Sequence, residues 1–524
     1  MTTILTSHRM VKSFKTFAVL LGALSIGACT TVGPDYERPD SPLPPNWYQD
    51  ELAAFDVSPE ARVRWWQALE DPVLDRLIER AQAQNDSLKI AALRVLESRA
   101  QLGIAAGSLY PQTQVAVGSA TIAQGSESAA NTAAGDLKFT DYLIGVSASW
   151  EPDFWGRYAR GIEAADASYL ASVAAYDQAL ILVIAQVADI YTVMRTVEEQ
   201  IRITRENIER QERSVEITEV QFRNGTSSEL DLLQARTLLL STKSTLPTFA
   251  SALARAQHAL RVLLGMAPGD LTDLLEGGGE IPVLPDSIAV GVPADLLRAR
   301  PDVRRAEFTA MAQSAAVGLA EANLYPSFSL GGFVGLQAAG NTSSTRTGED
   351  GIGELFSTDS LTYSFGPSFV WPFLNYDRIE NAVRVQDARL QQALLAYRDT
   401  VLRAAREVED AIVDLHNLRQ RDEILAQSVN AARRSAGLAM LRFKEGLADY
   451  QRVLSAEQAL FSQQSRYVQN RGDVVRSAIA LYLALGGGWQ IRLESPLLDE
   501  DTKRQMQERT DWGDLMDTAE NNLE

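Results

Sequence analysis

Two long segments of the chain share a heptad pattern of apolar positions. In the second segment, apolar or small residues recur in alternating steps of four and three, at Tyr397, Val401, Ala404, Val408, Ala411, Leu415 and Leu418. The same spacing runs from Tyr176 to Val197, 221 residues earlier. Heptad spacing is typical of helices that pack along a seam against neighbouring helices. No proline interrupts 158–222 or 379–443, and a helix of about 65 residues would be roughly 100 Å long.

Each long segment ends at a glycine. The sequences are Phe222-Arg-Asn-Gly225 and Phe443-Lys-Glu-Gly446, and a helical pattern resumes at 230–236 and 453–457. Because glycine commonly ends a helix, both sites predict sharp tips of antiparallel helical hairpins. A soluble coiled-coil rod has the same periodicity, so this pattern alone leaves that alternative open.

The two halves of the chain are related by an internal repeat. The offset of 221 residues also aligns 150–157 (WEPDFWGR) with 371–378 (WPFLNYDR). A second pair, Leu109-Tyr-Pro111 and Leu324-Tyr-Pro326, is aligned at an offset of 215 residues. The shared order of these motifs predicts a duplicated structural unit.

Immediately before each long helix the period changes to two. Apolar residues alternate with small or polar ones over 142–150 and 361–371, and each segment has an upstream partner that follows a Leu-Tyr-Pro motif. Strands of about 9–11 residues with one apolar face suit a transmembrane β-barrel. The hairpins, at about 110–150 and about 326–371, give four strands per chain. Four strands cannot close a barrel in lipid, so we expect three copies to supply twelve strands.

The N-terminus has the features of a bacterial lipoprotein signal. Arg9, Lys12 and Lys15 precede an apolar run over 17–26, and Gly-Ala-Cys29 follows. Such a segment is a secretory signal and is too short to span a membrane. Ile-Gly-Ala-Cys29 resembles the lipobox, which predicts lipidation of Cys29, the only cysteine. The alternative is a signal-peptide cysteine without lipid. Prolines at 42, 44 and 45 predict an extended, exposed tether, and no uninterrupted apolar 18-residue segment predicts a membrane helix.

Composition excludes several functions. The net charge is −19, and removing residues 1–28 takes it to −22, which disfavours nucleic acid as a partner. Only His8, His258 and His416 are present, no His/Cys group has metal-ligand spacing, and no P-loop occurs. We therefore predict no enzyme, no metal site and no cofactor.

The segment Leu284–Glu307 carries the strongest resemblance to a known family. Its core, 292–307 (VPADLLRARPDVRRAE), together with Trp65-Trp66, Asp71-Pro72 and Asn323-Leu-Tyr-Pro-Ser-Phe, resembles the outer membrane factors, the TolC-like family, in its OprM/NodT-type lipoprotein branch. The resemblance implies a homotrimer with a 12-stranded barrel in the outer membrane and a long periplasmic α-helical barrel. It implies a passive exit duct for small molecules, such as drugs, metals or other toxic compounds. A periplasmic adaptor protein and an inner-membrane pump, often of the resistance-nodulation-division (RND) type, would be its partners.

The domain organisation follows from these elements. The signal peptide covers 1–28, and the anchor, tether and start of an equatorial region cover 29–70. Repeat 1 covers 71–267, an inter-repeat linker covers 268–302 and repeat 2 covers 303–488. An acidic C-terminal tail covers 489–524, and its residues after Leu498 are expected to be mobile.

In the resembled family the closed gate lies at the tips and often uses aspartates. Ser455 occupies the place where an aspartate is common. The candidate tip and gate residues are Gly225, Asp231, Gly446, Asp449, Arg452 and Ser455. The alternative is that these are solvated residues without a gating role.

Two other functions fit part of the pattern. A periplasmic coiled-coil lipoprotein scaffold explains Cys29 and the heptads but leaves the four amphipathic strands unexplained. The outlet of an ATP-driven type I protein secretion system shares the architecture of the duct.

Overall fold

The computed structural model describes eleven stretches of the chain. They are 31–40, 47–48, 55–56, 63–126, 128, 138–269, 271–285, 288–289, 297–341, 352–494 and 496–516. Cys29, the signal peptide and the prolines at 42, 44 and 45 lie outside them. Contacts divide the chain into two compact units. The first, here called the sheet unit, comprises residues up to 38, 98–169 and 308–394; the second, the tip unit, comprises 39–97, 170–307 and 395–524.

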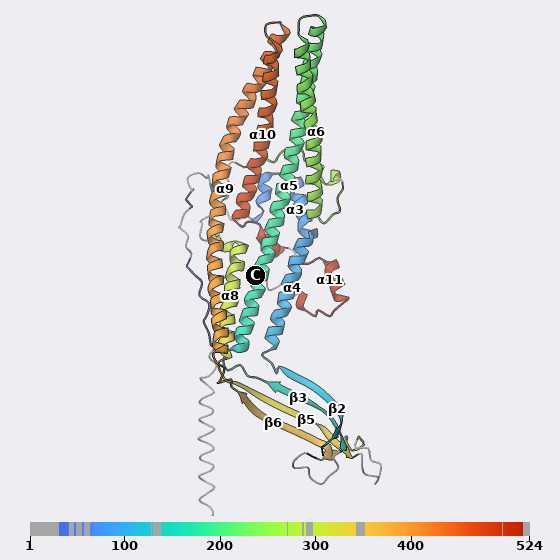
Figure 1. The fold of residues 1–524 in the computed structure, drawn as a ribbon, viewed down its shortest axis with the longest axis vertical. Coiled ribbons are helices and arrows are strands. Elements are labelled where there is room, and N and C mark those ends of the chain that lie inside the picture. The colour runs from blue at the N-terminus through green and yellow to red at the C-terminus, as the bar shows by residue number, and fades with distance from the viewer. Residues whose placement is uncertain are drawn as a thin grey trace, which may run out of the picture. The chain divides into compact units, whose positions relative to one another are not determined.

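The sheet unit contains one four-stranded antiparallel sheet (Figure 1). Its strands are β2 (Thr113–Gln124), β3 (Lys138–Trp150), β5 (Ser327–Asn341) and β6 (Leu361–Val370), in the order β2-β3-β5-β6. The pair β3–β5 joins the two repeats, and Gly145 lies opposite Gly335 in its register. Among the described strands, β2 and β6 each have a single neighbour, so both outer edges are unpaired.

The two faces of this sheet differ in polarity. One face of β3, β5 and β6 carries large apolar side chains that are exposed in the single chain, among them Ile144, Val146, Val334, Tyr363 and Phe365. The opposite face carries Ser, Thr and Gly side chains with one large exception, Phe333. On that face Ser329 and Ser368 share a 2.8 Å hydrogen bond. The alternation predicted from the sequence therefore produces a sheet with one apolar and one polar face.

Both repeats fix the ends of their hairpins in the same way. The indole Nε1 of Trp150 donates to the carbonyl oxygen of Leu109 at 3.0 Å, and that of Trp371 donates to Leu324 at 3.1 Å. Each tryptophan closes its hairpin onto the Leu-Tyr-Pro motif of its own repeat. The sheet unit also includes parts of α4 (Asp86–Gly107), α5 (Arg157–Arg223), α8 (Pro301–Ala322) and α9 (Arg378–Lys444).

The tip unit is built on two helical hairpins, α5–α6 and α9–α10, whose loops lie at the same end (Figure 1). Helices α5 and α9 have 67 residues each, close to the length expected from the heptad pattern. Their partners, α6 (Glu229–Leu263) and α10 (Tyr450–Ala484), have 35 residues each. The shorter elements are β1 (Phe55–Asp56), η2 (Trp65–Leu69), α3 (Pro72–Gln84), η3 (Thr272–Leu274), β4 (Ile288–Ala289), η5 (Trp489–Glu494) and α11 (Glu500–Gln507).

A buried ion-pair network in the tip unit connects the two repeats to the C-terminal segment. Asp177 on α5 is fully buried and accepts from Arg492 of η5 at 2.6 Å and from Arg304 of α8 at 3.3 Å. Burial raises the pKa of the Asp177 carboxyl, and the two arginines oppose that rise. Arg300 is also buried, and it contacts Glu407 of α9 at 2.8 Å. The described part of the linker signature, 297–307, thus contributes arginines that join both repeats.

The structure departs from the sequence prediction at both ends. The residues after Leu498 form helix α11, which buries Met506 and whose N-cap, Asp499, accepts from the Thr502 amide at 2.9 Å. The expectation of mobility is therefore wrong for this segment, because a capped turn and one buried side chain suffice to fold it. Residues 32–35 contact the sheet unit at several points, so this part of the predicted exposed tether is a docked segment.

One helix is long and apolar enough to cross a membrane. Among the described residues, α5 alone meets this test of length and composition, and 56% of its most apolar 18-residue window is buried within the chain. A core helix meets the same test when its apolar face packs against other helices. Burial of this window is consistent with the heptad seam predicted over 176–197.

Candidate functional site: the hairpin tips and the membrane-facing sheet

The first tip is closed by a glycine and a capping box. Gly225 has φ +74°, a conformation that glycine adopts without strain. The next helix begins after Ser228, whose Oγ accepts from the Asp231 amide at 3.2 Å, while the Asp231 carboxylate accepts from the Ser228 amide at 3.0 Å. Ser227 donates to the same carboxylate at 3.0 Å. The structure thus gives Asp231 a helix-capping role.

The capping hydrogen bonds also set the ionisation of Asp231. Partial burial raises the pKa of its carboxyl, but the hydrogen bonds from Ser228 and Ser227 outweigh burial and hold the pKa below its usual value. The carboxylate is therefore ionised at neutral pH. Its oxygens are directed to the backbone and hydroxyls of its own loop.

The second tip has the same turn but a different charge arrangement. Gly446 has φ +71°, and Asp449 is the N-cap of α10 without a side-chain capping bond. The Asp449 carboxylate lies 3.9 Å from Arg452 Nε, and both side chains are more than 70% exposed. Ser455 lies one turn further along α10 and accepts from Gln451 at 3.5 Å. Asp449 and Arg452 thus form an exposed pair that other groups can approach.

An aromatic core beneath the tips packs the two hairpins together. Tyr450 is 1% exposed and its ring meets Phe443 edge-on, with centroids 5.3 Å apart. Ala235 from the first hairpin and Val453 complete the buried cluster. The Tyr450 hydroxyl lies 3.2 Å from Ser214 Oγ on α5. Tyr450 therefore fixes the position of one tip relative to the other.

A buried carboxyl lies below this core. Glu457 of α10 is 8% exposed, and its Oε2 has no hydrogen-bond partner among the described residues. It lines a cavity of about 510 Å³ between α5, α9 and α10. The basic side chains that line the same cavity are Arg210, Arg213, Arg433 and Lys444. Burial raises the pKa of Glu457 to about 7, and Arg210 partly opposes this rise.

We expect Glu457 to make tip stability depend on pH. Between about pH 4.5 and 7 the unfolded carboxyl is ionised while the folded one keeps its proton, so stability falls as pH rises through this window, by up to about 3 kcal/mol. Glu457→Gln should remove this fall. The measurement is the unfolding midpoint of the helical signal at pH 5 and pH 8. Glu445→Gln, at an exposed tip position, is the control and should behave as wild type; an unchanged pH dependence in Glu457→Gln would contradict the assignment.

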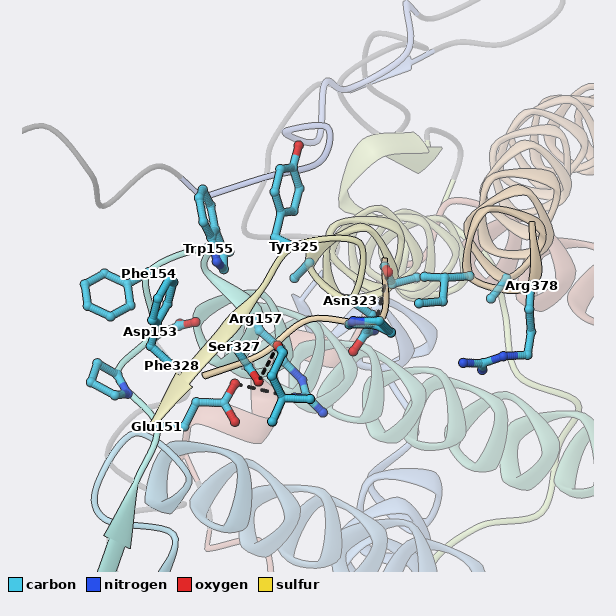
Figure 2. A pocket seen from close by; sticks show the side chains of 17 residues that line it. Glu151, Asp153, Phe154, Trp155, Arg157, Asn323, Tyr325, Ser327, Phe328 and Arg378 are labelled. Atoms are coloured by element: carbon cyan, nitrogen blue, oxygen red, sulfur yellow. Dashed lines mark hydrogen bonds and ion pairs between the residues drawn. The ribbon is translucent and has the colours of Figure 1, made fainter. Parts of the chain in front are cut away.

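The periplasmic rim of the sheet is lined by aromatic and charged side chains. Figure 2 shows a cavity of about 350 Å³ in the sheet unit, where the chain passes from strands into α5 and α9. Trp155 stacks on Tyr325 with centroids 4.7 Å apart, and its Nε1 donates to the Pro326 carbonyl at 2.8 Å. Arg157 lies 3.6 Å from Glu151. Aromatic residues of this kind are typical of the boundary between lipid and water.

The described residues contain no group of three or more His, Cys, Asp or Glu side chains that could hold a metal ion. The tip residues and the sheet therefore carry the functional argument.

Comparison with known proteins decides the family. The profile of the family described as outer membrane efflux protein matches residues 77–266 and 292–487. The chain belongs to the outer membrane efflux protein family. The predicted family is therefore confirmed, and so are the duplicated, mainly α-helical TolC-like fold and the outer-membrane location. The efflux protein is the outer-membrane exit component of an efflux system, and its family is one of channels.

Relatives of the efflux protein cover most of its length. Cation efflux system protein CusC of Escherichia coli O6:H1 is 30% identical over 472 residues, which cover 89% of this chain and 97% of CusC. Toluene efflux pump outer membrane protein TtgI of Pseudomonas putida is 29% identical over 495 residues, covering 92% and 99%. The solved outer-membrane channel OprN has a TM-score of 0.80 at 31% identity and covers 88% of this chain and 100% of OprN.

The sequence identified the tips of the efflux protein but missed two of the features that shape them. Asp231 was predicted as a gate residue, although Ser228-Ser-free spacing to the acid three positions later is the signature of a capping box and was available in the sequence. Glu457 was missed, because the pattern of α10 does not show that α5 and α9 cover it.

Proposed function

We propose that three copies of this chain form a passive duct from the periplasm through the outer membrane. The observation that carries the proposal is the four-stranded sheet, which has one apolar face and two unpaired edges. Unpaired backbone groups in hydrocarbon cost several kcal/mol each, so one copy cannot remain open in the bilayer. Joining β2 of one copy to β6 of the next closes twelve strands.

The cargo class follows from the relatives only in outline. CusC is named for cation efflux and TtgI for toluene efflux, which supports small molecules or ions as cargo, such as drugs, metals or other toxic compounds. A wide tube selects little, so the inner-membrane pump would choose among them. We propose a periplasmic adaptor and an RND-type pump as partners, with the adaptor approaching the tips.

We also propose that Cys29 carries the lipid anchor. The lipobox before it and its position as the only cysteine support this assignment. The relative SilC is named a probable outer membrane lipoprotein and is 29% identical over 469 residues.

Assembly and conduction test the duct directly. The purified mature chain in detergent should migrate as a trimer in unheated electrophoresis samples and as a monomer after boiling, and it should give stepwise currents in planar bilayers. A chain that stays monomeric and water-soluble without detergent would overturn the proposal. Full release from membranes by high salt would instead favour the coiled-coil scaffold.

The tips offer a test of gating. We expect Asp231→Ala with Asp449→Ala to raise the conductance in planar bilayers, because the first change removes a capping box worth about 0.5–2 kcal/mol and the second removes the exposed pair with Arg452. Each single variant separates the two causes. If Asp231→Ala alone gives the whole increase, loop order controls the opening; unchanged currents in the double variant would remove both aspartates from the gate.

A further inference from the structure

The segment just after the N-terminal cysteine is held by one buried arginine. Arg160, whose side chain is 4% exposed, donates from Nε to the Val32 carbonyl at 3.0 Å and from Nη2 to the Gly33 carbonyl at 3.2 Å. The same Nη2 lies 2.7 Å from the Asp35 carboxylate. The Val32 amide donates to the Trp155 carbonyl at 3.1 Å. Residues 32–35, here called the strap, thus make four polar contacts with the start of α5.

Close packing fixes the strap as well. A Cβ on Gly33 would lie 2.2 Å from Gly318 Cα, and Gly33 has φ +89°, so only glycine fits there. On the other side, a Cβ on Gly156 would lie 2.6 Å from the Thr31 methyl carbon. Ser314 of α8 donates to the Pro34 carbonyl at 3.3 Å. The strap therefore has one path across α5 and α8, set by backbone contact as much as by charge.

The path of the strap leads to the rim of the sheet. Its first hydrogen bond is to Trp155, which stacks on Tyr325 directly before β5. Two residues separate Thr31 from Cys29, a reach of at most about 7 Å. All of these groups belong to the sheet unit.

We propose that Arg160 and the Gly33–Gly318 contact form a clamp that holds the lipid-bearing N-terminus at the aromatic rim of the sheet. The diacylglyceryl group on Cys29 then enters the same leaflet beside the barrel wall, with its depth set by the clamp. Arg160 is a positioning residue in this arrangement. The inference rests on the proposed lipidation of Cys29.

A cross-linking experiment on the full-length protein tests the clamp. Thr31→Cys introduces a single reactive thiol, because the sulfur of a lipidated Cys29 is blocked. Benzophenone maleimide on residue 31 should cross-link to peptides that contain 151–157 or 325–328. In Arg160→Met the yield should fall about tenfold, because two strap carbonyls and the Asp35 carboxylate lose their charged donor.

The chain offers a matched control and a conservative rescue. Arg157 lies one turn earlier on α5, is 45% exposed and pairs with Glu151 instead of the strap, so Arg157→Met should keep the wild-type yield. Arg160→Lys keeps the charge but reaches fewer acceptors and should give an intermediate yield. Equal yields in wild type and Arg160→Met would overturn the clamp, as would equal losses in Arg160→Met and Arg157→Met.

A second variant guards against misfolding of the arginine mutant. Gly33→Val leaves α5 and α8 unchanged but cannot fit against Gly318, so it should reduce the cross-link while the heat-modifiable trimer persists. A retained cross-link would overturn the clamp. The intact mass of the wild-type protein reports lipidation separately: an unmodified Cys29 with a normal cross-link contradicts the proposed anchor, whereas a lipidated chain without the cross-link contradicts the clamp.

Discussion

Gly335→Val is expected to abolish assembly of the trimer in the outer membrane. A Cβ at Gly335 would lie 2.6 Å from the Ile144 carbonyl oxygen and 2.9 Å from the Gly145 Cα, atoms of the adjacent strand β3. Phe333 also lies 2.6 Å away. Since β3–β5 is the pair that joins the two repeats, separating these strands opens the sheet in its middle. Overpacking costs about 1–3 kcal/mol per site, and a trimer carries three such sites.

The amount of heat-modifiable trimer in outer-membrane extracts measures this effect. A total cost of about 3 kcal/mol or more corresponds to at least a hundredfold loss. Gly331→Val is the matched control, because Gly331 lies on the same face of β5 four residues earlier, and nothing lies within 4 Å of its Cβ position. Normal trimer levels in Gly335→Val, or an equal loss in Gly331→Val, would show that the tight β3–β5 contact does not limit assembly.

Asp177→Asn should cause the second large effect, on the stability of the tip unit. The substitution keeps the shape of the side chain but removes the charge that faces Arg492 and Arg304. Arg492 is 2% exposed on its side chain, so its guanidinium would lose its ionic partner Asp177 in the interior. Removing one partner of a buried ion pair typically costs about 3–5 kcal/mol.

A second ion pair on the same helix provides the control. Asp189 lies twelve residues further along α5 and pairs with Arg476 at 2.7 Å, but its side chain is 37% exposed. Exposed pairs contribute about 0–1 kcal/mol, so Asp189→Asn should shift the thermal midpoint of the helical signal several times less than Asp177→Asn. Equal shifts for the two variants would contradict a special role for the Asp177 network.

The sequence predicted the elements well because their signals are local. Heptads over 176–197 and 397–418 and the glycines at 225 and 446 located two helices of 67 residues and their tips. The alternation over 361–371 located β6, with one apolar face. These signals depend on period and turn chemistry, which a single segment carries by itself.

The side-chain arrangements were less predictable because they join distant segments. Asp177 and Arg492 are 315 residues apart, and Arg160 and Asp35 are 125 apart. Nothing in the pattern around any of these residues distinguishes it from the many charged positions on a solvated helix face. The signature at 297–307 was noticed by resemblance, and only the structure shows that its arginines bind Asp177 and Glu407.

The unpaired edges of β2 and β6 have a genetic consequence. In the proposed trimer every joint is the same head-to-tail contact, β6 of one copy with β2 of the next, so each copy takes part in two joints. A chain with a damaged β6 edge still offers a sound β2 edge and is incorporated. If half of the chains in a cell carry such damage, only about one ring in eight is free of it, and the mutant allele is dominant over the intact one.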